Sequence, residues 1–220
     1  MASAKKVEVE NVTVPKLKLD TVMVHIVGDS DLILNKKTDS TFRELTADDR
    51  KLAHKQEESE RNEWEDAITA LHWRDPRPYS DKRECTEEMF YQMLHENAPC
   101  ISAHGLRESW KSCVVRAGID TYSTKFDFQV SIRQKLIPIK FAAYQRDVLA
   151  MPQKGIGGGM LTAKLHRFSG WEAEIPVTYI KGGTYTLSAI VSIIEYAGYG
   201  LGIGSGTKSE YGRYHVEDVR

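Results

Sequence analysis

Apolar and polar side chains alternate along residues 161–168 and again along residues 171–180, which predicts two β-strands around a turn at Ser169-Gly170. In the first strand the polar face carries Lys164 and His166. One apolar and one polar face indicate a sheet that helices cover on one side only. We therefore expect these two strands to pair with each other as a β-hairpin.

Further stretches are typical of strands. Residues 21–27 (TVMVHIV) are β-branched and apolar, and residues 32–34 resume this strand after a break. Residues 136–141 form a short extended stretch, and the chain ends in a strand over residues 213–219. Residues 119–135 are ambiguous, although a strand-like alternation runs through Phe126, Phe128, Val130 and Ile132.

Helical spacing separates these strands. A long helix is expected from Thr46 to about Leu71, and Thr86 opens a short helix that buries Met89, Phe90 and Met93. Ser102 caps a third helix that runs to Gly118. Thr184 or Thr186 caps a strongly apolar helix over residues 187–197, which Gly198 closes.

The order of these elements is strand, helix, hairpin, helix, strand, with a large insertion after the first strand. This split βαβ order predicts an α+β, ferredoxin-like (RRM-type) fold, with an antiparallel sheet and helices on one face. We expect a single domain over residues 1–220, with a helical insertion at about residues 38–100. The open sheet face of such folds is a platform for nucleic acid.

Charge is unevenly distributed along the chain. Residues 39–96 hold 9 Lys and Arg against 16 Asp and Glu, whereas the remainder holds 21 basic and 15 acidic residues. A mildly basic body suits a polyanionic partner, but a long helix with a solvated charged face explains the acidic segment equally well. Charge alone therefore leaves both interpretations open.

Composition narrows the class of protein. The three cysteines, Cys85, Cys100 and Cys113, form an odd and widely spaced set, which favours a reducing compartment and gives no zinc motif. The first 18 residues lack the apolar core of a signal peptide, and no stretch approaches the ~18 apolar residues of a membrane helix. We expect a cytoplasmic protein without metal or cofactor.

Glycines recur at alternate positions 198, 200, 202, 204 and 206, close to the C-terminus. They predict backbone N–H groups that approach a ligand closely, and phosphate is the usual ligand of such groups. The sequence argues against a nucleotide-hydrolysing P-loop, because Thr207 replaces the second required glycine and the loop follows a helix. A structural role, with the loop packed closely over the first helix, stays open.

This ending resembles a known family. A helix that ends in glycine, a glycine-rich loop with a basic residue and then Gly-Arg-Tyr-His-Val (212–216) are similar to the C-terminal signature of the RAMP superfamily. These are the RRM-like proteins that form the guide-RNA backbone of CRISPR effectors, and small phage and mobile-element proteins share the ending. Residues 32–36 (LILNK), the helix at 103–117 and the Trp171 hairpin extend the resemblance to about two-thirds of the chain.

The resemblance implies a protein that binds single-stranded nucleic acid. Such a site needs cations for phosphates and aromatic faces for bases. Arg146, beside the glycines at 155–159, would belong to a thumb-like hairpin at about residues 136–160 that grips the strand, with residues 147–159 as its loop. Tyr214 is either a stacking or a core residue. The candidate ligands are Asn35, Lys36, Lys37, Arg146, Lys164, His166, Gly202, Gly204, Gly206, Lys208, Tyr211 and Arg213.

Three functions follow as hypotheses. The first is a non-catalytic protein that coats single-stranded DNA or RNA as a homo-oligomer or filament, without a membrane. The second is a metal-independent RAMP-type endoribonuclease, with His25 or His166 as general base. The third is a protein-interaction factor that mimics a CRISPR backbone subunit through its acidic insertion. The histidines lack nearby lysine or tyrosine partners in sequence, which favours the first.

Overall fold

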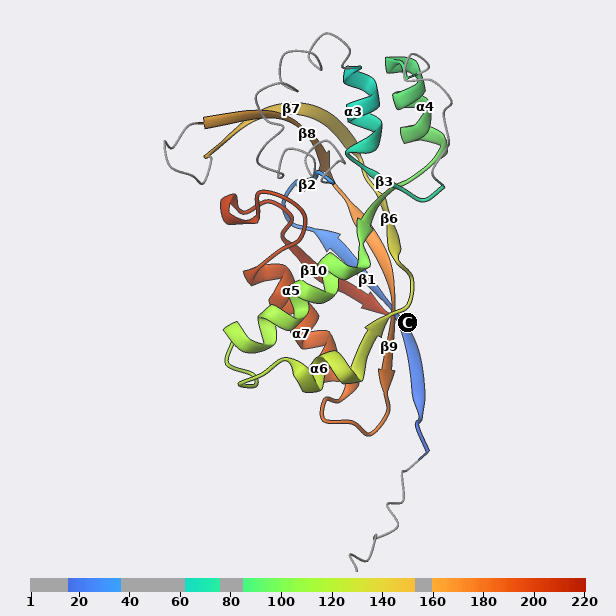
Figure 1. Ribbon diagram of the computed structural model, residues 1–220. Coiled ribbons are helices and arrows are strands. Elements are labelled where there is room, and N and C mark those ends of the chain that lie inside the picture. The colour runs from blue at the N-terminus through green and yellow to red at the C-terminus, as the bar shows by residue number, and fades with distance from the viewer. Residues whose placement is uncertain (1–15, 37–61, 76–84, 153–159) are drawn as a thin grey trace, which may run out of the picture.

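The computed structural model describes residues 16–36, 62–75, 85–152 and 160–220 as an α+β fold (Figure 1). Its larger sheet has the strand order β10-β1-β9-β6-β4-β3, and β5 also pairs with β9. Every strand pair in these residues is antiparallel. The strands are β1 (Leu19–Gly28), β3 (His72–Trp73), β4 (Pro99–Ser102), β5 (Val130–Ile132), β6 (Leu136–Lys140), β9 (Glu172–Ile180) and β10 (Tyr214–Val219).

Three helices cover one face of this sheet: α5 (Ala103–Arg116), α6 (Thr124–Gln129) and α7 (Leu187–Gly200) (Figure 1). Alternate residues of the central strands point into the core beneath them, and Ile26, Ile175 and Val177 are fully buried there. The Trp110 indole N–H donates to the Tyr214 hydroxyl at 2.9 Å, which ties α5 to β10. Tyr214 is therefore a core residue.

A smaller sheet lies at one end of the larger one. Its order is β2-β8-β7, formed by β2 (Leu32–Leu34), β7 (Ala143–Pro152) and β8 (Met160–Ser169). Helices α3 (Glu63–Thr69) and α4 (Glu87–Glu96) lie beside this sheet (Figure 1). Thr86 caps α4 as predicted, whereas Asn62, which was not predicted as a cap, begins α3; both side chains accept hydrogen bonds from the first turn of their helix.

A long two-stranded ribbon connects the two sheets. β6 pairs with β9 in the larger sheet, and β7 pairs with β8 in the smaller one. The ribbon changes sheet where Gly170, with φ 58°, lies against Ala142. The strands predicted at 161–168 and 171–180 are confirmed, but their mutual pairing is wrong, because the chain turns a corner at Gly170 instead of reversing.

Other element boundaries also differ from the prediction. Residues 124–129 are helical, so the strand predicted through Phe126 and Phe128 is wrong at these positions. Phe126 is buried and Phe128 is 82% exposed because they lie on different sides of this helix. Residues 143–152 form β7, where a loop was expected from residue 147. The last helix continues through Gly198 to Gly200. The prediction of one helix from Thr46 to about Leu71 is wrong at residue 62, because Asn62 is extended and caps α3, which ends at Thr69; residues 46–61 lie outside the described residues.

Candidate nucleic-acid interface

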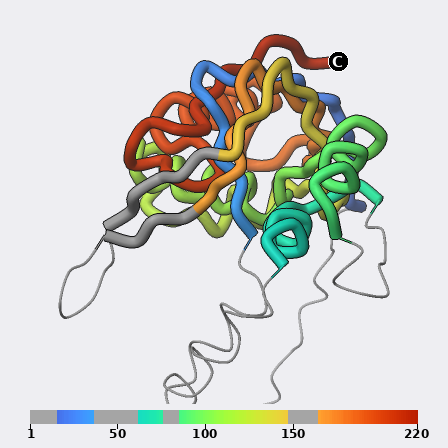
Figure 2. Tube along the Cα trace, turned by 90° about the horizontal axis from the view of Figure 1, so that it is seen from above, coloured from blue at the N-terminus to red at the C-terminus, as the bar shows by residue number. Residues whose placement is uncertain are grey.

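β2 is the meeting point of the predicted site. Ile33 pairs with Arg167 of β8 on one side, and on the other its carbonyl oxygen accepts a hydrogen bond from the Ser205 N–H at 2.8 Å. The glycine-rich segment, residues 198–212, thus lies along the free edge of β2. Seen from above, this segment (red) lies on one side of the β7–β8 hairpin, and α3 and α4 (teal and green) lie on the other (Figure 2).

The glycines of this segment make room for the protein's own backbone. A Cβ on Gly204 would meet the Ile33 carbonyl oxygen, and one on Gly212 would meet the Ile203 carbonyl oxygen. Both residues also have a positive φ, 79° and 70°, which glycine adopts most readily. Among the alternating glycines, open space surrounds only Gly200. Most of these glycines therefore serve close packing, the structural role that the sequence left open, although Gly204 packs against β2 and not over the first helix.

Polar contacts hold the segment to the elements around it. The Ser109 hydroxyl of α5 donates to the Gly202 carbonyl oxygen at 2.9 Å, and Gly202 itself is buried. The Gly212 N–H donates to the Asp31 carbonyl oxygen, and the Arg213 N–H donates to the Ser30 hydroxyl. These bonds hold the segment in one conformation between α5 and the start of β2.

One turn of the segment faces outward. Thr207–Ser209 form a short 3₁₀ helix after Gly206, whose φ is 73°. Lys208 on this turn is exposed, and no residue that the structure describes accepts a hydrogen bond from the backbone N–H of Gly206 or Thr207. Successive free N–H groups in such a turn favour an anion. The Arg213 guanidinium donates to the Thr207 carbonyl oxygen, and half-buried Tyr211 packs against Gly206.

Two further candidate cations meet across the β7–β8 hairpin. The Arg146 guanidinium donates to Glu63 Oε1 at 2.7 Å, and Lys164 Nζ donates to the same oxygen at 2.5 Å. The hydrogen bond from Lys164, followed by the attraction of Arg146, lowers the pKa of the Glu63 carboxyl. The carboxylate at the start of α3 therefore already forms charge-assisted hydrogen bonds with both predicted phosphate ligands.

The prediction that His166 lies on the open, polar face of its strand is wrong. Its ring is 1% exposed, packs 5.6 Å from the Phe90 ring and shares a hydrogen bond with the Tyr144 hydroxyl at 2.9 Å. Burial, with a smaller contribution from Arg146, lowers the pKa of His166 to about 4, and burial raises the pKa of Tyr144. His166 is a neutral core residue because α4 covers its face of the hairpin.

The end of β2 carries the remaining candidates. Asn35 and Lys36 are exposed, and the Lys36 N–H donates to the Ala70 carbonyl oxygen at 2.6 Å, just beyond α3. Lys37 lies outside the described residues. The structure thus brings Lys36, Lys164 and the Lys208 turn around one small sheet, although they are far apart in the sequence.

Two aromatic residues of this region, Trp64 and Tyr91, were not among the predicted ligands. The Arg146 guanidinium lies 5.0 Å from the centre of the Trp64 ring, and Tyr91 of α4 is 40% exposed beside Trp64 and Tyr144. Their signal in the sequence was an aromatic residue close to the acidic first turn of each helix. An exposed ring next to cations is the kind of surface on which a base stacks.

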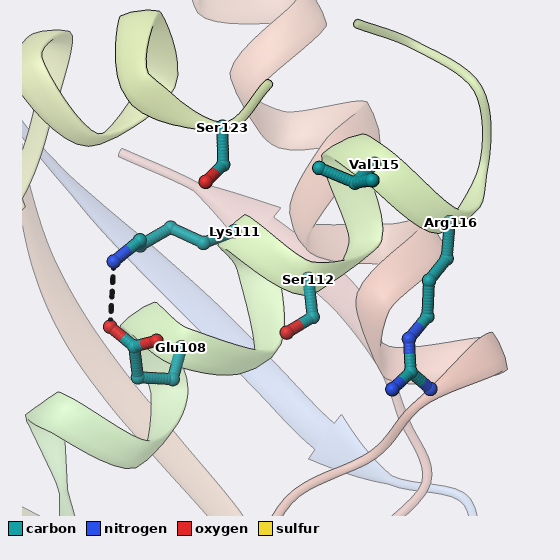
Figure 3. A pocket seen from close by; sticks show the side chains of 6 residues that line it. All are labelled: Glu108, Lys111, Ser112, Val115, Arg116 and Ser123. Carbon is teal, nitrogen blue, oxygen red and sulfur yellow. Dashed lines mark hydrogen bonds and ion pairs between the residues drawn. The ribbon is translucent and has the colours of Figure 1, made fainter. Parts of the chain in front are cut away.

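A separate hollow of about 330 Å³ lies on α5 (Figure 3). Of the two cations that line it, Lys111 is paired with Glu108 at 2.8 Å and with Asp127 at 3.5 Å. None of the predicted ligands lines it, so it adds nothing to the candidate interface. The lining residues are Glu108, Lys111, Ser112, Val115, Arg116 and Ser123.

Metal and membrane chemistry find no support within the described residues. These residues contain no group of three or more His, Cys, Asp or Glu side chains that could hold a metal ion. Within them, too, no helix has the length and apolar character needed to span a membrane.

A scan of protein-family models and a search of curated proteins found no match to the chain.

Proposed function

We propose that this chain is a non-catalytic, single-stranded nucleic-acid-binding protein with a ferredoxin-like, RAMP-type fold. The observation that carries the proposal is that exposed lysines from three separate segments lie around the small sheet, although one of them, Lys164, is paired with Glu63. Lys36 follows β2, Lys164 lies on the neighbouring β8, and the Lys208 turn follows Ser205, which pairs with Ile33.

The strand order supports the fold part of this proposal. β10, β1 and β9 lie in that order, and β9 is followed by β5 and β6. In chain order these are the fourth, first, third and second strands of a split βαβ unit, with α5 and α7 as its two helices. The elements from β2 to α4 are then an insertion after the first strand, and the β7–β8 hairpin is the thumb-like extension between the second and third.

The chemistry of a single-stranded polyanion suits this surface. Lysines spaced around β2 would contact successive phosphates, and the free N–H groups of Gly206 and Thr207 would hold one of them. Tyr91 supplies an exposed ring for a base. The glycines contribute indirectly, because they let the Lys208 turn lie directly against β2.

The burial of His166 favours binding over RNA cleavage. A general base must reach a ribose hydroxyl within hydrogen-bonding distance, whereas the His166 ring is enclosed by Tyr144 and Phe90. We therefore expect labelled RNA to stay intact after long incubation with the protein. Cleavage that His25→Ala abolishes would replace the binding proposal with the ribonuclease hypothesis.

Fluorescence anisotropy with labelled 30-nucleotide dT and U strands tests the proposal directly, using protein freed of nucleic acid by nuclease and high salt. Affinity should fall steeply between 50 and 200 mM salt, because each neutralised phosphate releases counterions. The triple variant Lys36→Ala/Lys164→Ala/Lys208→Ala should bind at least ten-fold more weakly.

The matched control is Lys125→Ala, because Lys125 lies on α6 and is paired with Asp120, away from β2. It should bind like the wild type. Absence of any anisotropy change at 50 mM salt, or equal weakening by the control, would rule the proposal out.

A further inference from the structure

The outer edge of β10 borders a groove. β10 is the terminal strand of the larger sheet, so within the described residues its outer edge has no partner strand. The Val216 N–H on this edge donates instead to the Glu195 carboxylate of α7. The hollow between α7 and β10, which we call the edge groove, has a volume of about 560 Å³. Such edges are templates for another extended segment.

The edge groove has an apolar floor and an acidic rim. Val191, Val216 and Val219 are half-buried, and the Tyr196 ring beside them is exposed. The carboxylates of Glu195, Glu217 and Asp218 line the same hollow. A complementary partner is therefore an extended segment in which apolar and basic residues alternate.

This chain itself contains such a segment. Residues 16–19, which we call the arm, read Lys-Leu-Lys-Leu, and Leu19 is also the first residue of β1. Leu17 is 59% exposed and Leu19 46% exposed, and both lysines are exposed as well. In an extended conformation the leucines point to one side and the lysines to the other.

The arm cannot reach the groove of its own chain. The Lys181 N–H donates to the Lys18 carbonyl oxygen at 2.9 Å, and Leu19 pairs with Ile180, so β9 holds the arm in line with β1. β10 ends opposite Met23, which exchanges hydrogen bonds with Arg220. In Figure 1 the first half of β1 accordingly continues beyond the point marked C. The arm therefore leaves the molecule away from the groove.

We propose that the arm of one copy adds as an extra strand to the β10 edge of a second copy. Leu17 and Leu19 would cover Val216 and Val219, and the two lysines would face Glu217 and Asp218. Because the arm and the edge groove are different surfaces, each copy can give its arm to one neighbour and receive an arm from another. Such a heterologous contact builds open chains or rings of copies.

Sedimentation velocity on nucleic-acid-free protein tests this contact independently of nucleic-acid binding. The wild type should form dimers and longer species as its concentration rises ten-fold, whereas Leu17→Asp/Leu19→Asp should stay monomeric. Tyr122→Asp, which alters a 70% exposed aromatic residue on another surface, should assemble like the wild type. Circular dichroism of each variant verifies its fold.

Cysteine cross-linking supplies a second measurement, since Cys85, Cys100 and Cys113 are all buried. A mixture of Leu17→Cys and Glu217→Cys proteins should form a mixed disulfide dimer in higher yield than the homodimers of either protein alone. A wild type that is monomeric at all concentrations, assembly that survives Leu17→Asp/Leu19→Asp, or a mixture that forms no mixed dimer would each overturn the proposal.

Discussion

Arg146 on β7 donates a hydrogen bond to the Glu63 carboxylate at the start of α3, with 2.7 Å between Nη1 and Oε1. Lys164 donates to the same oxygen, so one carboxylate of the insertion pairs with two cations of the hairpin. The contact also fixes α3 beside the hairpin. A phosphate that bound here would have to displace the Glu63 carboxylate from these two cations, and this competition can be measured.

Glu63→Gln should raise the affinity for single-stranded oligonucleotides. The amide keeps the shape of the side chain but removes the competing charge, which at a partly exposed site corresponds to roughly 0.5–1 kcal/mol, or about two- to five-fold in Kd. Fluorescence anisotropy at 50 mM salt measures the change. Glu108→Gln, which removes an exposed carboxylate paired with Lys111 on α5, should leave Kd unchanged. Equal affinities of wild type and Glu63→Gln would place Arg146 and Lys164 outside the interface.

Gly204→Ala should destabilise the fold. Its Cβ would meet the Ile33 carbonyl oxygen, and its φ of 79° disfavours any side chain, which together cost about 1–3 kcal/mol of unfolding free energy. Gly200→Ala is the matched control, because no atom lies within 4 Å of its Cβ position. Urea denaturation should show a clearly lower midpoint for Gly204→Ala and a wild-type or higher midpoint for Gly200→Ala. Equal midpoints would contradict a packing role for Gly204.

Tyr91→Ala should weaken binding of oligonucleotides with little effect on its salt dependence. A stacked base contributes ~1–3 kcal/mol, so Kd should rise about 5- to 150-fold, while the number of phosphate contacts stays the same. Tyr199→Ala, which removes an 83% exposed ring on α7, is the control and should bind normally. A parallel loss in both variants would point to a general effect of tyrosine removal and not to a stacking site.

Local pattern predicted most elements of this fold but not how the strands pair. The alternation at 161–168 and 171–180 correctly predicted β8 and β9, since each strand buries one face. Which strands become neighbours depends on contacts distant in sequence, and β9 lies between β1 and β6. A tight turn signal at Ser169-Gly170 cannot distinguish a reversal of the chain from a corner between two sheets.

The candidate site was predicted unevenly for a similar reason. Exposed cations such as Lys36 and Lys208 follow from sequence, because lysine is rarely buried. The exposure of His166 was predicted wrongly and the role of the glycines was left open, since burial by α4 and the approach of the Ile33 backbone are tertiary effects. The pairing of Glu63 could not be predicted either, because its partners on β7 and β8 lie 83 and 101 residues further along the chain.

Burial of His166 should make the fold sensitive to mild acid. The pKa of this imidazole is about 4 in the folded protein but about 6.5 when the chain is unfolded, so between these values only the unfolded chain takes up the proton. The neutral ring therefore contributes its full stability above pH 6.5, and about 3 kcal/mol is lost as the pH falls from 6.5 to 4. His166→Phe keeps an aromatic ring against Phe90 but cannot titrate. Urea midpoints at pH 7.5 and pH 5.0 should therefore fall more for the wild type than for His166→Phe, whose remaining loss comes from carboxylates such as Glu63. Identical losses in the two proteins would show that His166 is protonated in the fold and that its surroundings are open to water.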